Sequence, residues 1–243
     1  MKVLGIIPAR YGATRFPGKP LALIQGKPMI QWVYENASKA NLLNDLIVAT
    51  DHKSIADCVL AFGGKVMMTR TNHLSGTDRC AEIFEQLSVE EQYDCVINIQ
   101  GDEPLIDAQH INQLINLFKN EEVKIGSLVY PSFDKLAISN PNKVKVLTDK
   151  NNYAFRFGRI LENDRLAVPF YLHIGLYGFT TETLLKLVKL APTSNELTMK
   201  LEQLRWLDNG YKIKLAKVEN AGIGVDVPED IKKIEAILQK GTI

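Results

Sequence analysis

The most informative stretch of this chain reads Leu4-Gly5-Ile6-Ile7-Pro8-Ala9-Arg10-Tyr11-Gly12-Ala13-Thr14-Arg15-Phe16-Pro17-Gly18-Lys19-Pro20-Leu21. A short apolar run ends at Pro8 and opens into a loop with three cations and two glycines between Arg10 and Lys19. Glycine lets backbone N–H groups approach an anion, and proline stiffens the loop. Arginines bind phosphate oxygens in forked pairs, and lysine acts as a compact point charge. The loop suits a nucleoside triphosphate with magnesium; the alternative is a solvated basic loop between a strand and a helix.

Short apolar runs alternate with helical patterns from this stretch to the middle of the chain. We expect strands at residues 3–7, 46–49, 65–68 and 95–99, and helices at residues 28–37, 53–62 and 75–87. Ser75-Gly76-Thr77-Asp78 has the form of a capping box at the start of the third helix. This alternation is typical of βαβ units, so the sequence predicts an α/β fold with a mixed, mostly parallel sheet.

The second half of the chain has a different pattern. We expect strands at residues 124–130, 143–148, 153–157 and 171–179 with little helix between them, which indicates an antiparallel lobe at about residues 124–180. Helices are expected at residues 181–190, 196–207 and 228–239, and a further strand at residues 212–218. We find no repeat or linker, and the sequence predicts one domain over residues 1–243.

Bulk composition excludes several classes of protein. The 243 residues include 29 basic and 28 acidic ones, so no global field draws the chain to nucleic acid or to an anionic membrane. The cysteines, Cys58, Cys80 and Cys95, are too scattered for a disulfide framework or a zinc site, and we expect reduced thiols. No apolar run approaches the ~20 residues of a membrane span, and the first one is too short for a signal peptide. We therefore expect a cytoplasmic protein.

Two aspartates are candidates for binding a metal. Asp102 follows the strand at residues 95–99, and ligands of open α/β sheets bind beyond the carboxyl ends of the strands. It would thus face the cationic loop, as a magnesium ligand would; the alternative is that Asp102 and Glu103 form a turn or start the next helix. Asp226, in Gly224-Val225-Asp226-Val227-Pro228-Glu229-Asp230, is the second candidate, and its alternative role is to cap the following helix.

Other polar residues have weaker signals. On the strand at residues 171–179, Tyr171, His173, Gly175, Tyr177 and Phe179 share one face, which would suit a polyhydroxylated ligand. A single strand histidine is also common as a structural residue. We expect Asp51 to cap the next helix and His52 to point to water, and we assign neither a catalytic role. In the helix at residues 196–207 we expect Leu197, Leu201 and Leu204 to face inward, with Glu202 and Gln203 on the flanks.

Several common motifs are missing from the sequence. There is no Gly-x-x-x-x-Gly-Lys-Ser/Thr loop, no Gly-x-Gly-x-x-Gly after a strand and no Gly-x-Ser-x-Gly elbow. These absences argue against a P-loop NTPase, a Rossmann dehydrogenase and an α/β-hydrolase.

Taken together, the motifs resemble those of the bacterial 3-deoxy-manno-octulosonate cytidylyltransferases (CMP-Kdo synthetases). The resemblance spans nearly the whole chain in order, through Ile7-Pro8-Ala9-Arg10-Tyr11, Arg15-Phe16-Pro17-Gly18-Lys19-Pro20-Leu21, Val48-Ala49-Thr50-Asp51, Ser75-Gly76-Thr77-Asp78-Arg79, Asn98-Ile99-Gln100-Gly101-Asp102-Glu103-Pro104, His173-Ile174-Gly175, Leu201-Glu202-Gln203-Leu204-Arg205 and Gly224-Val225-Asp226-Val227-Pro228-Glu229-Asp230. The related CMP-sialate synthetases share the opening Ile-Pro-Ala-Arg, but the second half of this chain fits them poorly.

The resemblance implies a nucleotide-diphospho-sugar transferase fold of the glycosyltransferase-A type, a three-layer sandwich, and a homodimer whose interface lies in the antiparallel lobe. It implies a magnesium-dependent attack of the sugar's anomeric hydroxyl on the α-phosphorus of CTP, which gives CMP-Kdo and pyrophosphate for lipopolysaccharide synthesis. The partners would be CTP and a 2-keto-3-deoxy sugar acid, with no nucleic acid and no membrane.

The resemblance also implies roles for single residues. Those expected to act in catalysis are Arg10, Lys19, Asp102 and Asp226, the last two as magnesium ligands. Those expected to bind CTP are Ala9, Arg10, Lys19, Ser75, Gly76, Thr77 and Arg79. Those expected to line the sugar pocket are Arg15, Gln100, Arg159, His173, Tyr177, Glu202 and Gln203.

Two segments depart from the family pattern. Arg156-Phe157-Gly158-Arg159-Ile160-Leu161 stands where Tyr-Phe-Ser-Arg and an Ile-Pro segment are common. Thr193-Ser194-Asn195-Glu196 replaces a more usual Pro-Ser-x-Leu-Glu form. Both fall near the expected sugar site, so an 8-amino analogue of the octulosonate stays open as the acceptor. A non-catalytic nucleotide-sugar sensor on the same fold is the alternative from another class.

Overall fold

A computed structural model describes residues 1–12, 15–87, 92–132, 135–160, 170–220 and 222–241. The chain forms two compact units. Unit 1 comprises Met1–Asn112 with Gly222–Ile243, and unit 2 comprises Gln113–Ala221. Residues 13 and 14 of the cationic loop and residues 161–169 of the expected lobe lie outside the described residues. The prediction of one domain over residues 1–243 stays a prediction.

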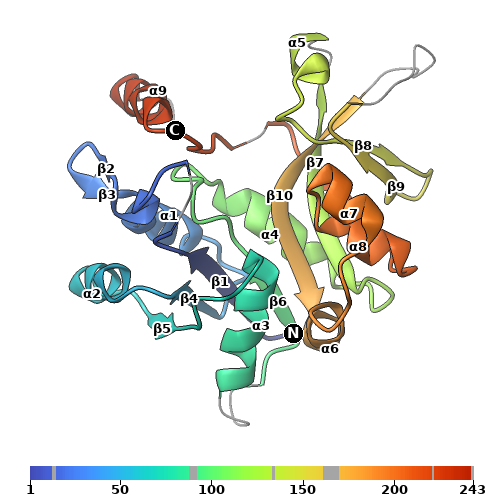
Figure 1. The fold of residues 1–243 in the computed structure, drawn as a ribbon, viewed down its shortest axis with the longest axis horizontal. Coiled ribbons are helices and arrows are strands. Elements are labelled where there is room, and N and C mark those ends of the chain that lie inside the picture. The colour runs from blue at the N-terminus through green and yellow to red at the C-terminus, as the bar shows by residue number, and fades with distance from the viewer. Residues whose placement is uncertain (13–14, 88–91, 133–134, 161–169, 221, 242–243) are drawn as a thin grey trace. The chain divides into compact units, whose positions relative to one another are not determined.

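Unit 1 contains a parallel sheet in the order β5-β4-β1-β6 (Figure 1). Its strands are β1 (Val3–Ala9), β4 (Asp45–Thr50), β5 (Val66–Met68) and β6 (Cys95–Asn98), which confirms the parallel sheet predicted for the first half. After β1 the chain adds β4 and β5 on one side and then β6 on the other. The order therefore reverses between β1 and β6, and such a switch point opens a crevice at the carboxyl ends of the strands.

The four helices expected in unit 1 are present as α1 (Met29–Ala37), α2 (Lys53–Ala61), α3 (Gly76–Gln86) and α9 (Glu229–Gln239). The structure adds the short 3-10 helix η1 (Lys19–Leu21) and a hairpin of β2 (Leu23–Ile24) and β3 (Lys27–Pro28), which were not predicted. The predicted capping box is confirmed, because Ser75 Oγ accepts the N–H of Asp78 and the Asp78 carboxylate accepts the N–H of Ser75. Helix α4 (Ala108–Leu117), which crosses the boundary of the units, was not predicted.

The carboxyl-terminal segment of unit 1 packs against the first part of the chain. Ile24 and Met29 form a buried apolar cluster with Val225 and Ile234, and Phe16 packs against this cluster. Burial of apolar side chains favours this arrangement by about 25 cal/mol for each square ångström removed from water. The cluster thus brings residues 225 and 226 beside the loop that follows β1.

Unit 2 contains a mixed arrangement of strands (Figure 1). They are β7 (Ile125–Ser132), β8 (Lys145–Thr148), β9 (Tyr153–Gly158), β10 (Phe170–Thr180) and β11 (Ile213–Lys217). The predicted antiparallel pairing is confirmed for β10 with β7 and β8, and for β8 with β9. Strand β11 differs, since it runs parallel to β7 and antiparallel to β9.

The helices of unit 2 correct one prediction. They are α5 (Lys135–Ser139), α6 (Thr181–Leu187), α7 (Ser194–Met199) and α8 (Gln203–Asp208), so the single helix expected at residues 196–207 is wrong. Lys200 has φ 53°, in the left-handed region, and ends α7. Because the helix breaks there, the inward face changes, and Leu197 is 65% exposed while Leu201 and Leu204 are buried.

The structure also describes the state of the cysteines and the character of the helices. The cysteines are free thiols, with Cys80 and Cys95 buried and Cys58 half-buried. Within the described residues, no helix has the length and apolar character needed to cross a membrane.

Candidate functional site

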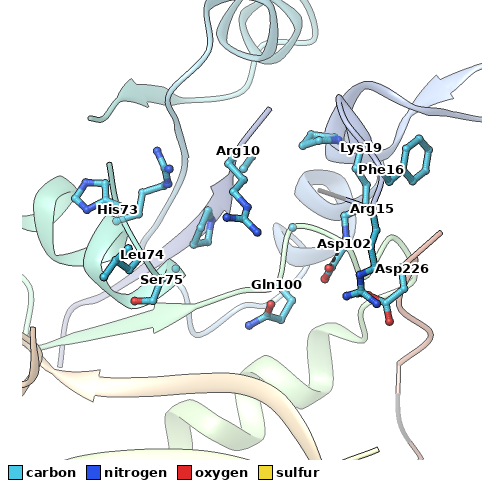
Figure 2. Close-up of a pocket in the computed structure, with 16 residues that line it drawn as sticks. Arg10, Arg15, Phe16, Lys19, His73, Leu74, Ser75, Gln100, Asp102 and Asp226 are labelled. Carbon is cyan, nitrogen blue, oxygen red and sulfur yellow. Dashed lines mark hydrogen bonds and ion pairs between the residues drawn. The ribbon is translucent and has the colours of Figure 1, made fainter. Parts of the chain in front are cut away.

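Unit 1 carries a cavity of about 350 Å³ at the carboxyl ends of β1 and β6 (Figure 2). The residues that line it come from the loops after these strands, from the start of α3 and from the segment before α9. Predicted site residues among them are Ala9, Arg10, Arg15, Lys19, Ser75, Gly76, Arg79, Gln100, Asp102 and Asp226. The cavity therefore gathers residues that are far apart in sequence at the switch point of the sheet.

Lys19 and Asp102 form an ion pair inside this cavity. Lys19 Nζ lies 2.7 Å from Asp102 Oδ2, with both side chains at least partly buried. The same ammonium group donates to the backbone carbonyl of Val225 at 2.9 Å, and the Val225 N–H donates to the Asp102 carbonyl at 2.8 Å. Val225 thus ties the carboxyl-terminal segment to both members of the pair.

Asp226 forms the second ion pair of the cavity. Its Oδ1 lies 3.0 Å from Arg15 Nη2, and both side chains are exposed. Asp226 is not the N-cap of the following helix but lies shortly before it, because Pro228 is the N-cap of α9 and the Asp230 carboxylate accepts the N–H groups of Asp226 and Val227. The side chain of Asp226 is therefore directed to the cavity by the turn before α9.

Arg10 differs from the other cations of the loop. It is exposed, and it has no ion-pair partner among the residues that the structure describes. Figure 2 shows its guanidinium pointing into the cavity, on the opposite side from Asp226. Its five N–H donors can therefore bind an anion that enters the cavity.

The start of α3 forms one wall of the cavity. Ser75 uses its hydroxyl oxygen as the acceptor of the capping box and can still donate its own hydrogen. Gly76 lies beside Pro8 and Asn98, where a β-carbon would come within 3.3 Å of Pro8. Thr77 is buried and is not among the residues that line the cavity. Its predicted part in binding CTP stays a prediction.

The guanidinium of Arg79 is held by hydrogen bonds to three neighbouring residues. Its Nη2 donates to Asp51 Oδ2 at 2.9 Å, and its Nη1 donates to Thr69 Oγ1 and to the Arg70 carbonyl.

The roles expected for Asp51 and His52, the two residues after β4, are wrong. His52, not Asp51, caps α2, since its Nδ1 accepts the Ser54 N–H, and its ring stacks on Tyr11.

The turn after β6 requires a glycine. A β-carbon on Gly101 would lie 2.6 Å from the carbonyl oxygen of Pro8, so a larger residue would separate the ends of β1 and β6.

Glu103, which follows Asp102, has a raised pKa. Burial and the charge of Asp102 raise the pKa of Glu103 to about 7.

The two aspartates fit the chemistry of magnesium. Magnesium takes one or two carboxylates, retains several waters and completes its shell with substrate phosphates. Asp102 and Asp226 are two carboxylates in one cavity, and a third is not needed. The described residues contain no cluster of three or more His, Cys, Asp or Glu side chains of the kind that holds a metal without a substrate. Each carboxylate would exchange its present cation for the metal.

The expected sugar residues are divided between the units. Arg15 and Gln100 line the cavity of unit 1. In unit 2, the rings of His173 and Tyr177 lie 5.2 Å apart, which confirms that they share one face of β10. Ser127 Oγ lies 2.8 Å from His173 Nε2 and donates to backbone carbonyls at the irregularity of β10, and burial lowers the pKa of His173 to about 3.

Tyr177 carries an unusual buried group. Its hydroxyl is one of the buried side-chain polar atoms without a hydrogen-bond partner in the described part of the chain. Burial and the charge of Glu202 raise the pKa of Tyr177 well above its ordinary value. A buried hydroxyl of this kind gains free energy when a ligand supplies the missing partner.

Arg159 and Gln203 have structural contacts in unit 2. The Arg159 guanidinium donates to the carbonyls of Met199, Lys200 and Pro141, so it supports the break between α7 and α8. Gln203 is buried at the start of α8, although a flanking position was expected. The sugar contacts predicted for these residues stay predictions.

Some lining residues have no counterpart in the sequence predictions. They are Pro8, Phe16, Pro20, His73, Leu74 and Gly101. His73 pairs with the Glu82 carboxylate, which also accepts the Arg70 N–H. His73 could have been found from the sequence, because it lies two residues before Ser75, where the segment predicted to bind CTP begins.

The chain is similar to proteins of a known family over most of its length. A family model described as cytidylyltransferase matches residues 4–213. A 3-deoxy-manno-octulosonate cytidylyltransferase of Fusobacterium nucleatum subsp. nucleatum is 45% identical over 100% of this chain and 99% of that protein. An 8-amino-3,8-dideoxy-manno-octulosonate cytidylyltransferase of a Shewanella species is 46% identical over 99% of this chain and 100% of that protein.

A solved structure extends the comparison to three dimensions. It is a CMP:2-keto-3-deoxy-manno-octonic acid synthetase complexed with CTP, with a TM-score of 0.93 and 34% identity over 99% of this chain and 100% of that chain. The likeness therefore holds in sequence and in fold over the full length.

Proposed function

Because this chain belongs to the 3-deoxy-manno-octulosonate cytidylyltransferase family, we propose that it transfers a cytidylyl group from CTP to 3-deoxy-manno-octulosonate. The products are CMP-Kdo and pyrophosphate, and the sugar nucleotide serves lipopolysaccharide synthesis. The observation that carries this proposal is the cavity itself, which places Arg10, Lys19 and two carboxylates at the switch point of the sheet.

The cations of the first loop supply the electrostatic part of the reaction. Attack of the sugar hydroxyl on the α-phosphorus puts negative charge on the equatorial oxygens and on the departing pyrophosphate. Arg10 donates hydrogen bonds to the phosphate oxygens, because its guanidinium has no ion-pair partner among the described residues. Lys19 leaves Asp102 for the phosphates and stabilises the developing charge, which is the largest contribution in many enzymes of this kind. No covalent enzyme intermediate is needed.

The start of α3 and the end of β1 hold the nucleoside. Backbone groups at Ala9 and Gly76 border the cavity, and the Ser75 hydroxyl can donate to a ribose or phosphate oxygen. Arg79 is fixed by its contacts with Asp51 and Thr69, so its side chain is preorganised at the wall of the cavity. A preorganised side chain loses less conformational entropy when the nucleotide binds.

Asp102 and Asp226 would hold magnesium. When bound, the ion supplies charge neutralisation at the phosphates and lowers the pKa of a coordinated hydroxyl. Asp102, on the loop after β6, and Asp226, on the segment before α9, would supply the protein carboxylates for the ion.

The remaining parts of the proposal concern the acceptor and the assembly. We assign the sugar contacts to Arg15 and Gln100 of unit 1 and to residues of unit 2, namely Arg159, His173, Tyr177, Glu202 and Gln203. The arginines suit the sugar carboxylate, and the unpartnered Tyr177 hydroxyl suits a sugar hydroxyl. We further propose a three-layer fold of the glycosyltransferase-A type and a cytoplasmic homodimer with its interface at about residues 124–180.

Release of pyrophosphate tests the function directly. The chain is mixed with magnesium, one of the four nucleoside triphosphates and one 2-keto sugar acid, and pyrophosphate is measured. We expect turnover with CTP and Kdo and little with the other nucleotides. Binding of CTP without release of its pyrophosphate in the presence of any acid sugar would instead identify a nucleotide-sugar sensor.

A second acceptor follows from the comparisons. The Shewanella relative is named for 8-amino-3,8-dideoxy-manno-octulosonate and is as similar to this chain as the Kdo-named relative. The same assay with both sugars decides between them through their values of kcat/KM.

A further inference from the structure

Asp51 enters the proposed function only through its contact with Arg79, although its position also connects it to the first loop. It follows β4, the strand between β1 and β5, and the register pairs Thr50 with Ala9 on one side and with Met68 on the other. The loops after both neighbouring strands therefore begin beside Asp51. One loop carries Arg10 and Lys19, and the other leads through Thr69 to the wall formed by α3.

The two carboxylate oxygens of Asp51 bind one partner on each side. Oδ1 accepts the backbone N–H of Tyr11 at 3.3 Å, and Oδ2 accepts Nη2 of Arg79 at 2.9 Å. The Asp51 side chain is 12% exposed and that of Arg79 is 3% exposed, so water screens this ion pair weakly. A single carboxylate thus connects the first loop to the opposite wall of the cavity.

The contact at Tyr11 extends to the phosphate-binding end of the loop. The Tyr11 carbonyl accepts the Gly18 N–H at 2.9 Å, and its ring stacks on His52 at 4.0 Å. Gly18 has φ 69°, a conformation that favours glycine, and it directly precedes Lys19. A shift of Tyr11 away from Asp51 would therefore move the backbone of Lys19.

The contact at Arg79 fixes the orientation of its guanidinium. Nη1 donates to Thr69 Oγ1 and to the Arg70 carbonyl, while Nη2 donates to Asp51. Since donors on both terminal nitrogens are engaged, the planar group cannot rotate freely, and its remaining donors keep one direction. Asp51 supplies the charged contact in this set.

We infer that Asp51 is a positioning residue, which holds the first loop and Arg79 in the arrangement that binds the nucleotide. The inference rests on the proposed function. Capping does not explain Asp51, because His52 caps α2. The carboxylate acts through Tyr11 and Arg79, so its loss should weaken nucleotide binding more than sugar binding.

The test compares Asp51→Asn with Asp57→Asn in the full chain. The asparagine at position 51 keeps an acceptor for the Tyr11 N–H but loses the charge that binds Arg79. Asp57 is a matched control, since it pairs at 2.7 Å with Lys53 on the exposed face of the neighbouring helix. Calorimetry measures the Kd for CTP with magnesium and without sugar, and steady-state assays measure KM for each substrate.

We expect Asp51→Asn to raise the Kd and the KM for CTP on the order of tenfold, the range for a lost charged hydrogen bond. The KM for the sugar acid and all values of Asp57→Asn should stay unchanged. A merely structural role would lower kcat through loss of folded protein and leave the Kd of the folded fraction unchanged. That result, or a wild-type Kd for Asp51→Asn, would overturn the inference.

A second variant tests the Arg79 contact without removing a charge. Thr69→Val removes one hydrogen bond of the same guanidinium, and we expect the Kd for CTP to rise severalfold. An unchanged Kd would contradict the role given to Arg79.

The proposed function can fail separately from the role of Asp51. Wild-type protein that binds CTP but releases no pyrophosphate would overturn the function, while the ratio of CTP affinities would still decide the role of Asp51.

Discussion

The ammonium nitrogen of Lys19 lies 2.7 Å from a carboxylate oxygen of Asp102, so the first loop neutralises an acidic residue of the cavity that it faces. Arg15 and Asp226 form a second pair of the same kind at 3.0 Å. In the protein without ligands, each candidate metal ligand is thus bound by a cation of the loop. Binding of a metal–triphosphate complex would exchange partners: the carboxylates receive the metal, and the cations receive the phosphates.

The first prediction follows from this exchange. Lys19→Ala should bind Mn²⁺ more tightly than the wild type in the absence of CTP, on the order of tenfold, because Asp102 no longer has a competing cation. The same variant should be severely impaired in turnover with every sugar acceptor. Electron paramagnetic resonance of free Mn²⁺ measures the affinity. Lys27→Ala, which removes the partner of Glu35, is the control, and equal Mn²⁺ affinity for Lys19→Ala and wild type would contradict the exchange.

The second prediction concerns the carboxylates. Asp102→Asn should lower kcat by at least ~10²-fold, the scale for losing one electrostatic stabiliser of the transition state. Asp226→Asn should act in the same direction, and Asp57→Asn should leave kcat unchanged. Pyrophosphate release at saturating CTP and sugar provides the measurement. Near-normal turnover of Asp102→Asn with magnesium would remove this carboxylate from the mechanism.

The third prediction concerns the turn after β6. Gly101→Ala places a β-carbon against the carbonyl oxygen of Pro8 and should destabilise the chain by about 1–3 kcal/mol, the usual cost of overpacking. Gly12→Ala is the control, because a β-carbon there meets no atom within 4 Å. Urea denaturation gives both free energies of unfolding. Equal stability of the two variants would show that the ends of β1 and β6 can separate at little cost.

The fourth prediction is a dependence of stability on pH. Burial lowers the pKa of His173 from 6.5 to about 3, so the unfolded chain binds a proton between these values and the folded chain does not. The stabilisation from the neutral imidazole is present above pH 6.5 and is lost as the pH falls toward 3, by up to about 1.4 kcal/mol per pH unit.

Tryptophan fluorescence can isolate this effect. The chain has two tryptophans, and Trp206 lies 5.0 Å from the Tyr177 ring in the same cluster as His173. A Trp32→Phe background leaves Trp206 as the reporter for urea unfolding between pH 4 and 7. His173→Gln in this background should flatten the pH dependence, and an unchanged slope would mean that another group is responsible.

The sequence was sufficient for much of unit 1. The strands β1, β4 and β6 are nearly continuous apolar runs, and Ser75 and Asp78 carry a complete helix-start signal, so local pattern and tertiary structure agree. Helix α4 was also readable, since Ile111, Leu114 and Ile115 have helical spacing, but no helix was predicted there.

Other features depend on contacts that local pattern does not contain. The break at Lys200 involves neither glycine nor proline, and it is supported by Arg159, which follows β9. The pairing of Lys19 with Asp102 joins residues 83 positions apart, so no local pattern contains it. The sequence could indicate that these groups meet, but not which of them bind one another.

The contacts of Val225 have a consequence for synthesis of the protein. Lys19 emerges from the ribosome long before Val225, whose carbonyl accepts its ammonium group and whose N–H binds Asp102. A nascent chain that has not reached this segment lacks both Val225 contacts, so Lys19 and Asp102 are not tied to the carboxyl-terminal segment. Premature termination before residue 225 would therefore yield a fragment with the charged loop but without its restraint.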